Sequence, residues 1–351
     1  ALTVGAAQPV QAKSVKVKTP LEVKDYVTEP RKQIPVVDSA DVVIVGGGTA
    51  GVSCAYNAAN KGLKTLVIEK NSFLGGSITS SLVIPAMKTS KNSINNDFFN
   101  ELFLILKEMN GAIKYCDGNK GWFNPELTKI ALDQMLISAG ADIKFETCIN
   151  KIDYTDNKTL IYIDTSDANN IISKDNGLLE YIETRYLVDA TGDAKICEKL
   201  NCEFLKNEKE NFQPSNLRFI MSGVDTKAFS DWIMSLDKDR NVTTSCVIDG
   251  NTYVSTAYTW DTNKKWALRP LFEQAIANGD ITEDDCNYFQ LFSIAGTPNS
   301  IAFNAPRILE PIVSRSKAYV DARASIYRLS EFCRMYLLGF EKAYISQIAY
   351  N

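Results

Sequence analysis

Gly46-Gly47-Gly48-Thr49-Ala50-Gly51 follows directly on Asp41–Val45, an apolar and β-branched run that is typical of a buried parallel strand. The small residues of Val52–Ala59 come next and predict a helix that packs closely against a sheet. Lys64–Ile68 then predicts a second strand, which ends at Glu69. Strand, glycine loop, helix, strand and acid therefore stand in the order of a βαβ unit.

Each part of this unit has a physical role. Gly46 permits a tight turn, Gly48 leaves the backbone open to a diphosphate, and Gly51 lets the helix approach the strands. The helix N-terminus offers free N–H groups and partial positive charge to phosphates. Glu69 lies about 20 residues beyond the glycines, the separation expected of a carboxylate that binds ribose hydroxyls. Together these features predict a bound dinucleotide.

Composition excludes several classes of partner. The 351 residues carry a net charge of −4 without a basic cluster, so no nucleic-acid partner is expected. No apolar run reaches the roughly 18 residues of a membrane span. The hydrophobic content of 45% is ordinary for a globular protein, and the length suffices for two domains.

Histidine is absent from the sequence, which removes histidine from acid–base and metal chemistry. None of the eight cysteines has Cys-x-x-Cys spacing, so neither a zinc site nor an iron–sulfur cluster is expected. No metal site and no specific catalytic residue are predicted.

The N-terminal residues 1–40 are expected to form an extended arm. Within them, Ala1–Ala12 is similar to the end of a signal peptide with a small-residue cleavage site, and a plain tail is the alternative. The first interpretation implies an exported or periplasmic protein, and the second a cytoplasmic one.

Helices and strands alternate beyond Glu69. Residues 95–110 predict an amphipathic helix, and Asn124 is expected to cap a further helix that has Pro125 in its first turn and ends at Gly140. Antiparallel strands are then predicted at Ile143–Asp153, Leu160–Thr165 and Tyr181–Thr184. They form a β-meander in place of a second crossover helix.

The chain is expected to return to the parallel sheet at Tyr186–Ala190, and Thr191, Gly192 and Asp193 follow. Ligands of open α/β sheets bind at this carboxyl edge. Asp193 is a candidate to face the cofactor, although the role of N-cap for Ala194–Leu200 is favoured.

The expected fold class is α/β, with a Rossmann-like domain that has a parallel sheet and a β-meander crossover, and a second α+β substrate domain. Long helices are predicted at 265–278 and 315–338. The expected boundaries are 1–40 for the arm, 41–203 for the nucleotide domain, 204–310 for the substrate domain and 311–351 for a C-terminal helix with a truncated return to the nucleotide domain.

With these pieces in order, the sequence resembles the FAD-dependent oxidoreductase family of the glutathione-reductase-like flavoprotein superfamily, related to the flavoprotein component of heterodisulfide reductase. The resemblance rests on the segments Val42–Gly51, Leu74–Thr79, Asn124–Leu127, Leu187–Asp193, Gln213–Ser215, Phe219–Asp225 and Leu338–Glu341.

The resemblance implies FAD as the cofactor. The cofactor-binding residues that it implies are Gly46, Gly48, Thr49, Ala50, Gly51, Glu69, Lys70, Gly75, Gly76, Ser77, Thr79, Cys148, Ile149, Ala190, Thr191, Gly192 and Asp193. Similar proteins continue past the helix that ends near Gly339, whereas this chain stops at Asn351, so we expect a C-terminally truncated flavin pocket.

The function expected on this basis is hydride transfer between a small organic substrate and bound flavin, with an electron acceptor of unknown identity. Arg218 and Arg307 are candidates for holding an anionic substrate. An NAD-binding dehydrogenase is one alternative, and the meander and the Gly75-Gly76 pair argue against it. The other is a truncated, non-catalytic scaffold that binds nucleotide or serves as an interaction module.

Overall fold

The computed structural model describes residues 36–86, 96–155, 158–164, 179–205, 214–237, 242–257, 266–308 and 314–350. Residues 35–351 form one compact unit. The predicted signal-like segment and most of the expected arm lie outside the described residues.

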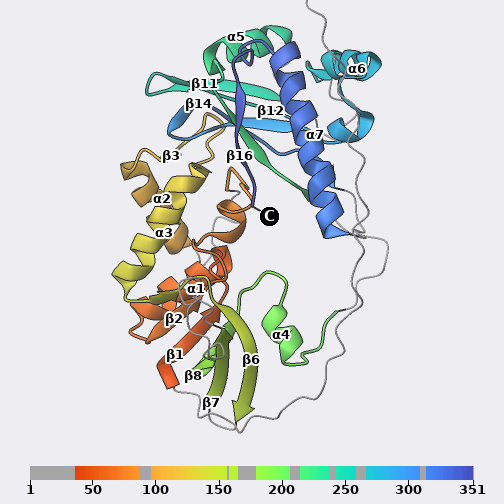
Figure 1. Cartoon of the computed structure of the whole chain (residues 1–351). Helices are drawn as coiled ribbons and strands as arrows, with labels where there is room; N and C mark the ends of the chain where they lie inside the picture. Colours follow the sequence, from red (N-terminus) through yellow and green to blue (C-terminus); the bar gives the residue numbers. More distant parts are fainter. Residues whose placement is uncertain are drawn as a thin grey trace, which may run out of the picture. The chain divides into compact units, whose positions relative to one another are not determined.

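The first sheet carries the nucleotide-binding unit and has the strand order β5-β2-β1-β8-β7-β6 (Figure 1). Its parallel strands are β1 Val36–Val45, β2 Thr65–Ile68, β5 Asp142–Lys144 and β8 Leu179–Asp189. The strands β6 Cys148–Thr155 and β7 Lys158–Asp164 extend it in antiparallel pairing. The predicted parallel sheet with a β-meander crossover is therefore confirmed.

Three details of this sheet differ from the sequence prediction. The expected strand Ile143–Asp153 is two strands, because β5 joins the parallel sheet beside β2 and β6 starts the meander. The expected strands at 181–184 and 186–190 are the single strand β8, which pairs with β7 on one edge and β1 on the other. β1 begins at Val36, inside the expected arm, because its early residues also pair with β8.

Helices cover one face of this sheet. α1 Thr49–Asn60 connects β1 to β2, and α2 Asn96–Glu108 and α3 Pro125–Ala139 lie between β2 and β5. Asn124 accepts hydrogen bonds from the N–H groups of Glu126 and Leu127, which confirms the predicted cap of α3. Between the two helices lies a short hairpin, β3 Ala112–Ile113 and β4 Trp122–Phe123.

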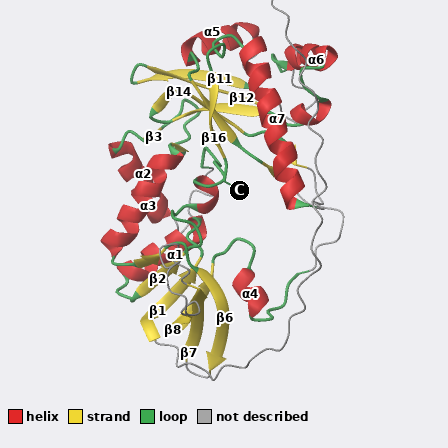
Figure 2. Cartoon of the chain, in the orientation of Figure 1, coloured by secondary structure: helices red, strands yellow, loops and turns green. Residues whose placement is uncertain are grey.

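The second sheet is antiparallel and has the order β11-β12-β13-β14-β10-β16 (Figure 2). Its strands are β10 Phe219–Ser222, β11 Thr243–Ile248, β12 Asn251–Ala257, β13 Gln290–Ile294, β14 Thr297–Phe303 and β16 Tyr344–Ile348. The accompanying helices are α5 Thr226–Leu236, α6 Arg269–Asn278, the short 3₁₀-helix η3 Glu283–Cys286, and α7 Arg315–Tyr336. A two-stranded ribbon, β9 Ser215–Asn216 with β15 Arg307–Ile308, flanks it.

The C-terminal strand β16 pairs with β10 in the second sheet and not with the nucleotide sheet. Tyr350 then donates from its backbone N–H to Ser80 O at 2.7 Å. This hydrogen bond links residue 350 to the nucleotide unit.

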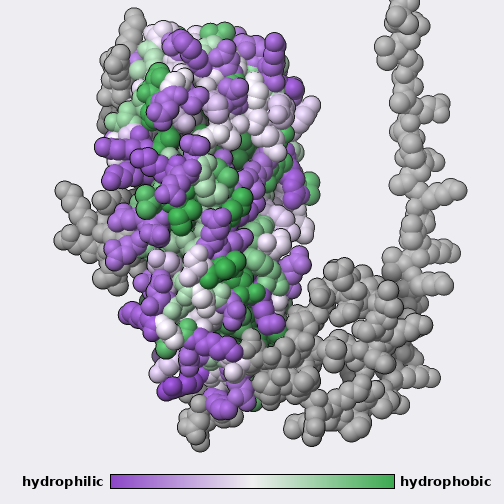
Figure 3. Space-filling model, turned by 90° about the vertical axis from the view of Figure 1, so that its left-hand side faces the viewer, coloured by the Kyte–Doolittle hydropathy of each residue, from purple (hydrophilic) through white to green (hydrophobic). Residues whose placement is uncertain are grey.

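One continuous hydrophobic core joins α1, α2 and α3 to the second sheet, and a smaller core lies on the other face of the first sheet. On the face viewed in Figure 3, hydrophobic and hydrophilic residues are interspersed. Among the described residues, no helix combines the length and apolar character that a membrane crossing requires.

Candidate functional site

Two glycines of the first loop are required by packing within the protein. Gly46 has φ +102°, and a Cβ there would lie 2.3 Å from Ala190 O. A Cβ at Gly51 would lie 1.8 Å from Gly46 O. Both positions exclude any side chain because backbone atoms already fill the space, as the sequence predicted for the tight turn and for the close helix.

Gly48 differs, because nothing in the protein requires glycine there. Its φ of −70° is open to every residue, and a Cβ would meet only Gly76 Cα, at 3.9 Å. It is the N-cap of α1 and supplies no side-chain cap, and Thr49 and Ala50 beyond it are exposed. Among the described residues, no side chain lies within 4 Å of a Cβ at Gly48 and none caps the first turn of α1, so an anion can bind there. This bare cradle fits the diphosphate of a dinucleotide.

The second glycine pair lies directly beside the first loop. Gly75 N–H donates to Gly47 O at 2.8 Å, and a Cβ at Gly76 would lie 2.9 Å from Gly48 Cα. Ser77 is exposed in the short 3₁₀-helix η1 Gly76–Ile78. The structure thus brings together two predicted glycine segments that are separated by the whole of α1 and β2.

Thr79 is buried, and its hydroxyl donates to Leu74 O at 2.7 Å. Its side chain also fills the space beside Gly75, where a Cβ would lie 2.5 Å from Thr79 Cγ2. In this structure Thr79 holds the turn that carries the glycine pair.

Glu69 is buried at the end of β2, and N–H donors surround its carboxylate. Oε2 accepts from Gly47 N–H at 2.6 Å, and Oε1 accepts from the backbone N–H and the side-chain Nδ2 of Asn71 at 2.9 and 2.8 Å. Each carboxylate oxygen has more than one acceptor site, so Oε2 retains capacity for a hydroxyl donor. Lys70 beside it is exposed.

The start of β6 runs beside Glu69. Thr147 N–H donates to Glu69 O at 3.1 Å, and Cys148 and Ile149 follow it, exposed and half-buried respectively. The segment Ala190–Asp193 reaches the same edge, because Ala190 N–H donates to Val45 O at 2.8 Å. The predicted cofactor residues therefore gather at one sheet edge although they come from five segments of the chain.

Asp193 does not cap the following helix, so the favoured N-cap prediction is wrong. The N-cap of α4 Lys195–Lys199 is Ala194, which makes no side-chain cap. Asp189 takes this role: its Oδ2 accepts from the N–H groups of Ile196 and Cys197 at 3.0 and 2.9 Å. Thr191 Oγ1 accepts from Lys195 N–H at 2.9 Å, which leaves Asp193 exposed.

Arg218 and Arg307 come together around Tyr288. Arg307 Cζ lies 4.6 Å from the centre of the Tyr288 ring, and Arg218 also lies near Tyr288. Arg218 Nη1 donates to Leu82 O at 3.4 Å, in the segment that follows η1. Burial lowers the pKa of the Arg218 guanidinium.

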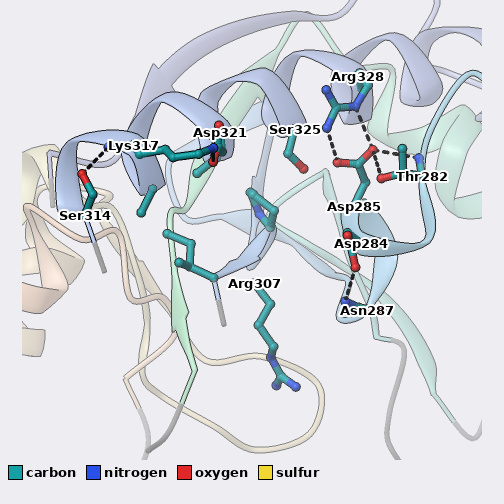
Figure 4. A pocket seen from close by; sticks show the side chains of 14 residues that line it. Thr282, Asp284, Asp285, Asn287, Arg307, Ser314, Lys317, Asp321, Ser325 and Arg328 are labelled. Atoms are coloured by element: carbon teal, nitrogen blue, oxygen red, sulfur yellow. Dashed lines mark hydrogen bonds and ion pairs between the residues drawn. The ribbon is translucent and has the colours of Figure 1, made fainter. Parts of the chain in front are cut away.

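Arg307 also lines a cavity of about 510 Å³ between η3, β15 and α7. Inside it, Arg328 binds Asp285 through two hydrogen bonds of 2.8 and 2.7 Å. Figure 4 shows the Arg307 side chain extending away from this pair. Within the described ranges, no group of three or more Cys, Asp and Glu side chains is arranged to hold a metal ion.

Sequence reasoning missed Gly47, Asn71 and Asp189. A Cβ at Gly47 would lie 2.4 Å from Leu74 Cδ2, so a side chain there would have to displace the buried leucine. Asn71 holds Glu69, and its position two residues after the acid was an available signal. Asp189 has no such local signal, because its partners lie up to eight residues further along the chain.

Comparisons with known proteins show which family the chain resembles. The profile of the FAD dependent oxidoreductase family matches residues 41–351. Mitochondrial dihydrolipoyl dehydrogenase of Caenorhabditis elegans is 29% identical over 154 residues, which cover 44% of this chain and 28% of that protein. Thiamine thiazole synthase of Saccharolobus solfataricus is 31% identical over 118 residues, or 34% of this chain and 41% of that protein. The chain spans less than half the length of these two relatives.

Among solved structures, p-nitrophenol 4-monooxygenase PnpA from Pseudomonas putida DLL-E4 has a TM-score of 0.50 at 12% identity, with 89% of this chain and 67% of that chain covered. At this identity the similarity is one of fold. The family profile, in contrast, extends over both sheets and over every predicted cofactor residue. The chain belongs to the FAD dependent oxidoreductase family.

Proposed function

We propose that this protein is an FAD-dependent oxidoreductase that transfers a hydride between a small organic substrate and bound flavin. The observation that carries the proposal is the bare Gly48 at the uncapped N-terminus of α1, where neither backbone conformation nor packing accounts for glycine. A site for a diphosphate accounts for it.

Residues of the chain divide the binding of the cofactor between them. Gly46–Gly51 and the first N–H groups of α1 would hold the diphosphate, and Glu69 would accept from a ribose hydroxyl. Cys148 and Ile149 would border the adenine, and the segment 190–193 would close over the nucleotide. When bound, FAD supplies the hydride chemistry, and the protein orients it and shapes the electrostatics around it.

The substrate would lie between the η1 segment and the second sheet. Arg218 supports this location, because it belongs to the chain entering β10 and yet donates to Leu82 O near η1. We further propose that the family relationship is to the glutathione-reductase-like flavoproteins, including the flavoprotein component of heterodisulfide reductase, on the basis of the glycine pair and the Ala190–Asp193 segment.

A visible absorption spectrum of the purified protein tests the proposal. We expect flavin bands, and release of FAD rather than FMN on denaturation. A colourless protein that binds NAD but not added FAD would establish the dehydrogenase alternative, and one that binds neither would establish the non-catalytic scaffold.

A further inference from the structure

Three polar side chains lie in or next to the β9–β15 ribbon. Arg307 on β15 stands directly opposite Asn216 on β9, and cross-strand partners point to the same face. Arg218 follows Asn216 by two residues, just beyond the end of β9, and Leu217 between them is buried. Sheet register therefore places Asn216 beside Arg307, and Tyr288 lies near both Arg307 and Arg218.

This face carries positive charge without a counter-ion. Among the described residues, neither arginine has an ion-pair partner, and the Arg218 guanidinium donates to the neutral carbonyl of Leu82. Arg307 Nε and Asn216 Nδ2 are buried, and no described residue forms a hydrogen bond with either. Donors that are removed from water and left unpaired are costly, and the cost is largest for charged groups. An anionic ligand would offset it.

The carboxylate of Asp285 does not neutralise this face. Asp285 accepts two hydrogen bonds from Arg328. It also accepts one from the backbone N–H of Thr282 at 2.8 Å. The Arg307 side chain points away from this carboxylate (Figure 4). The guanidinium groups of Arg218 and Arg307 are thus available to a ligand that can accept bidentate hydrogen bonds.

A hydrogen-bond acceptor lies next to the same tyrosine. Asn304 Nδ2 donates to Tyr288 OH at 3.5 Å and to Gln290 Oε1 at 3.3 Å, which fixes the orientation of the amide. Asn304 Oδ1 is buried, and none of the residues that the structure describes donates to it. A phosphate monoester dianion has no donor to offer this oxygen, whereas a hydroxyl or amino group does.

We propose that Asn216, Arg218 and Arg307 bind the carboxylate of a small organic acid, and that Asn304 accepts from a hydroxyl or amino group next to that carboxylate. This acid is the substrate of the flavoenzyme, and its identification as the substrate rests on the proposed function. The binding site itself belongs to the protein chain and is testable without turnover.

Calorimetric titration of the purified protein tests the site with lactate as the probe. We expect saturable binding of lactate and no binding of lactamide, in which the carboxylate is replaced by a neutral amide. Propionate, which lacks the hydroxyl, is expected to bind about 10-fold more weakly. Methyl phosphate, present as its dianion, that binds as tightly as lactate would overturn the choice of a carboxylate.

Substitutions of the two arginines and of Asn304 test which side chains bind lactate. Arg218→Met and Arg307→Met should each weaken lactate binding by about 10- to 100-fold, since each removes charge-assisted hydrogen bonds. Arg334→Met removes an exposed arginine that pairs with Glu331 and should leave binding unchanged. Asn304→Ala should abolish the difference between lactate and propionate, and a preserved difference would refute the role of Asn304.

Arg218→Lys and Arg307→Lys keep the charge, so they distinguish a loss of binding from a folding defect. Each should bind lactate more weakly than the native protein but more tightly than the Met variant. Lactate binding with no flavin in the protein would refute the proposed function and leave this site standing. If the native protein has its normal flavin content but does not bind lactate, this site alone is refuted.

Discussion

A Cβ at Gly51 would lie 1.8 Å from Gly46 O, whereas a Cβ at Gly48 would meet nothing closer than 3.9 Å. The two glycines belong to one motif, yet the fold explains only the first. This difference separates residues that build the loop from the residue that leaves space for a ligand.

We therefore expect Gly48→Ala and Gly51→Ala to fail in different ways. The Gly48→Ala protein should lose most of its bound FAD, because the methyl group occupies the space of the diphosphate. Without flavin, its melting temperature should equal that of the flavin-free native protein. Gly51→Ala should lower the melting temperature itself, because backbone must move. Thermal unfolding and flavin absorbance measure the two effects. Full flavin content in Gly48→Ala would contradict the assignment.

Glu69→Gln tests the other end of the site. Three N–H donors converge on the Glu69 carboxylate, and a glutamine amide would turn its own NH₂ group toward one of them. An unpaired buried donor costs about 1–3 kcal/mol, so the free energy of unfolding in urea should fall by that amount. The exposed Glu198, paired with Lys195, is the control, and its Gln variant should change stability by less than about 0.5 kcal/mol.

Among the secondary-structure elements, α3 has ends that neighbouring residues mark, and it agrees with the sequence prediction. α3 begins after Asn124 and ends at Gly140, whose φ of +85° suits glycine, and both features were predicted from neighbouring residues. The start of α4 differs from the predicted N-cap. Asp189, which precedes the helix by several residues, accepts hydrogen bonds from the N–H groups of the helix. An element of five residues depends on such outside contacts.

The Asp189 contacts predict a pH dependence. Burial alone would raise the pKa of Asp189, but hydrogen bonds from Cys197 and Thr191 outweigh it and hold the pKa below its ordinary value. A lowered pKa stabilises the folded state fully above the unfolded value of about 3.9, and the stabilisation is lost as pH falls through the lower folded value. Urea unfolding from pH 6 to pH 3 should therefore show a smaller loss of stability in Asp189→Asn than in the native protein. Parallel losses in both proteins would contradict this role.

At the scale of the whole molecule, the two sheets are joined by one core. Trp122 on β4 lies 6.2 Å from Phe292 on β13, ring centre to ring centre. Asn124 Nδ2 donates to Ala295 O at 3.3 Å, and a Cβ at Gly296 would lie 2.4 Å from Asn110 O. The helical layer of the nucleotide unit is thus packed closely on the second sheet.

This shared core predicts a single unfolding transition. Near-ultraviolet circular dichroism reports aromatic packing and far-ultraviolet circular dichroism reports backbone structure, and the two melting curves should coincide. Phe292→Ala should shift both curves to lower temperature together, because it removes a buried ring at the contact between the sheets. Two separate transitions would show that the sheets unfold independently.

The sequence by itself determined the βαβ unit with its glycine loop, the acid at the end of β2, and the cap of α3. These features depend on backbone geometry and on hydrogen bonds between residues close in the chain, so local residue types suffice. The tertiary structure alone decided that β5 joins the parallel sheet, that β16 pairs with β10, and that Asn216 and Arg307 face each other. Strand pairing joins residues far apart in the chain, and no local pattern specifies the register that brings those side chains together.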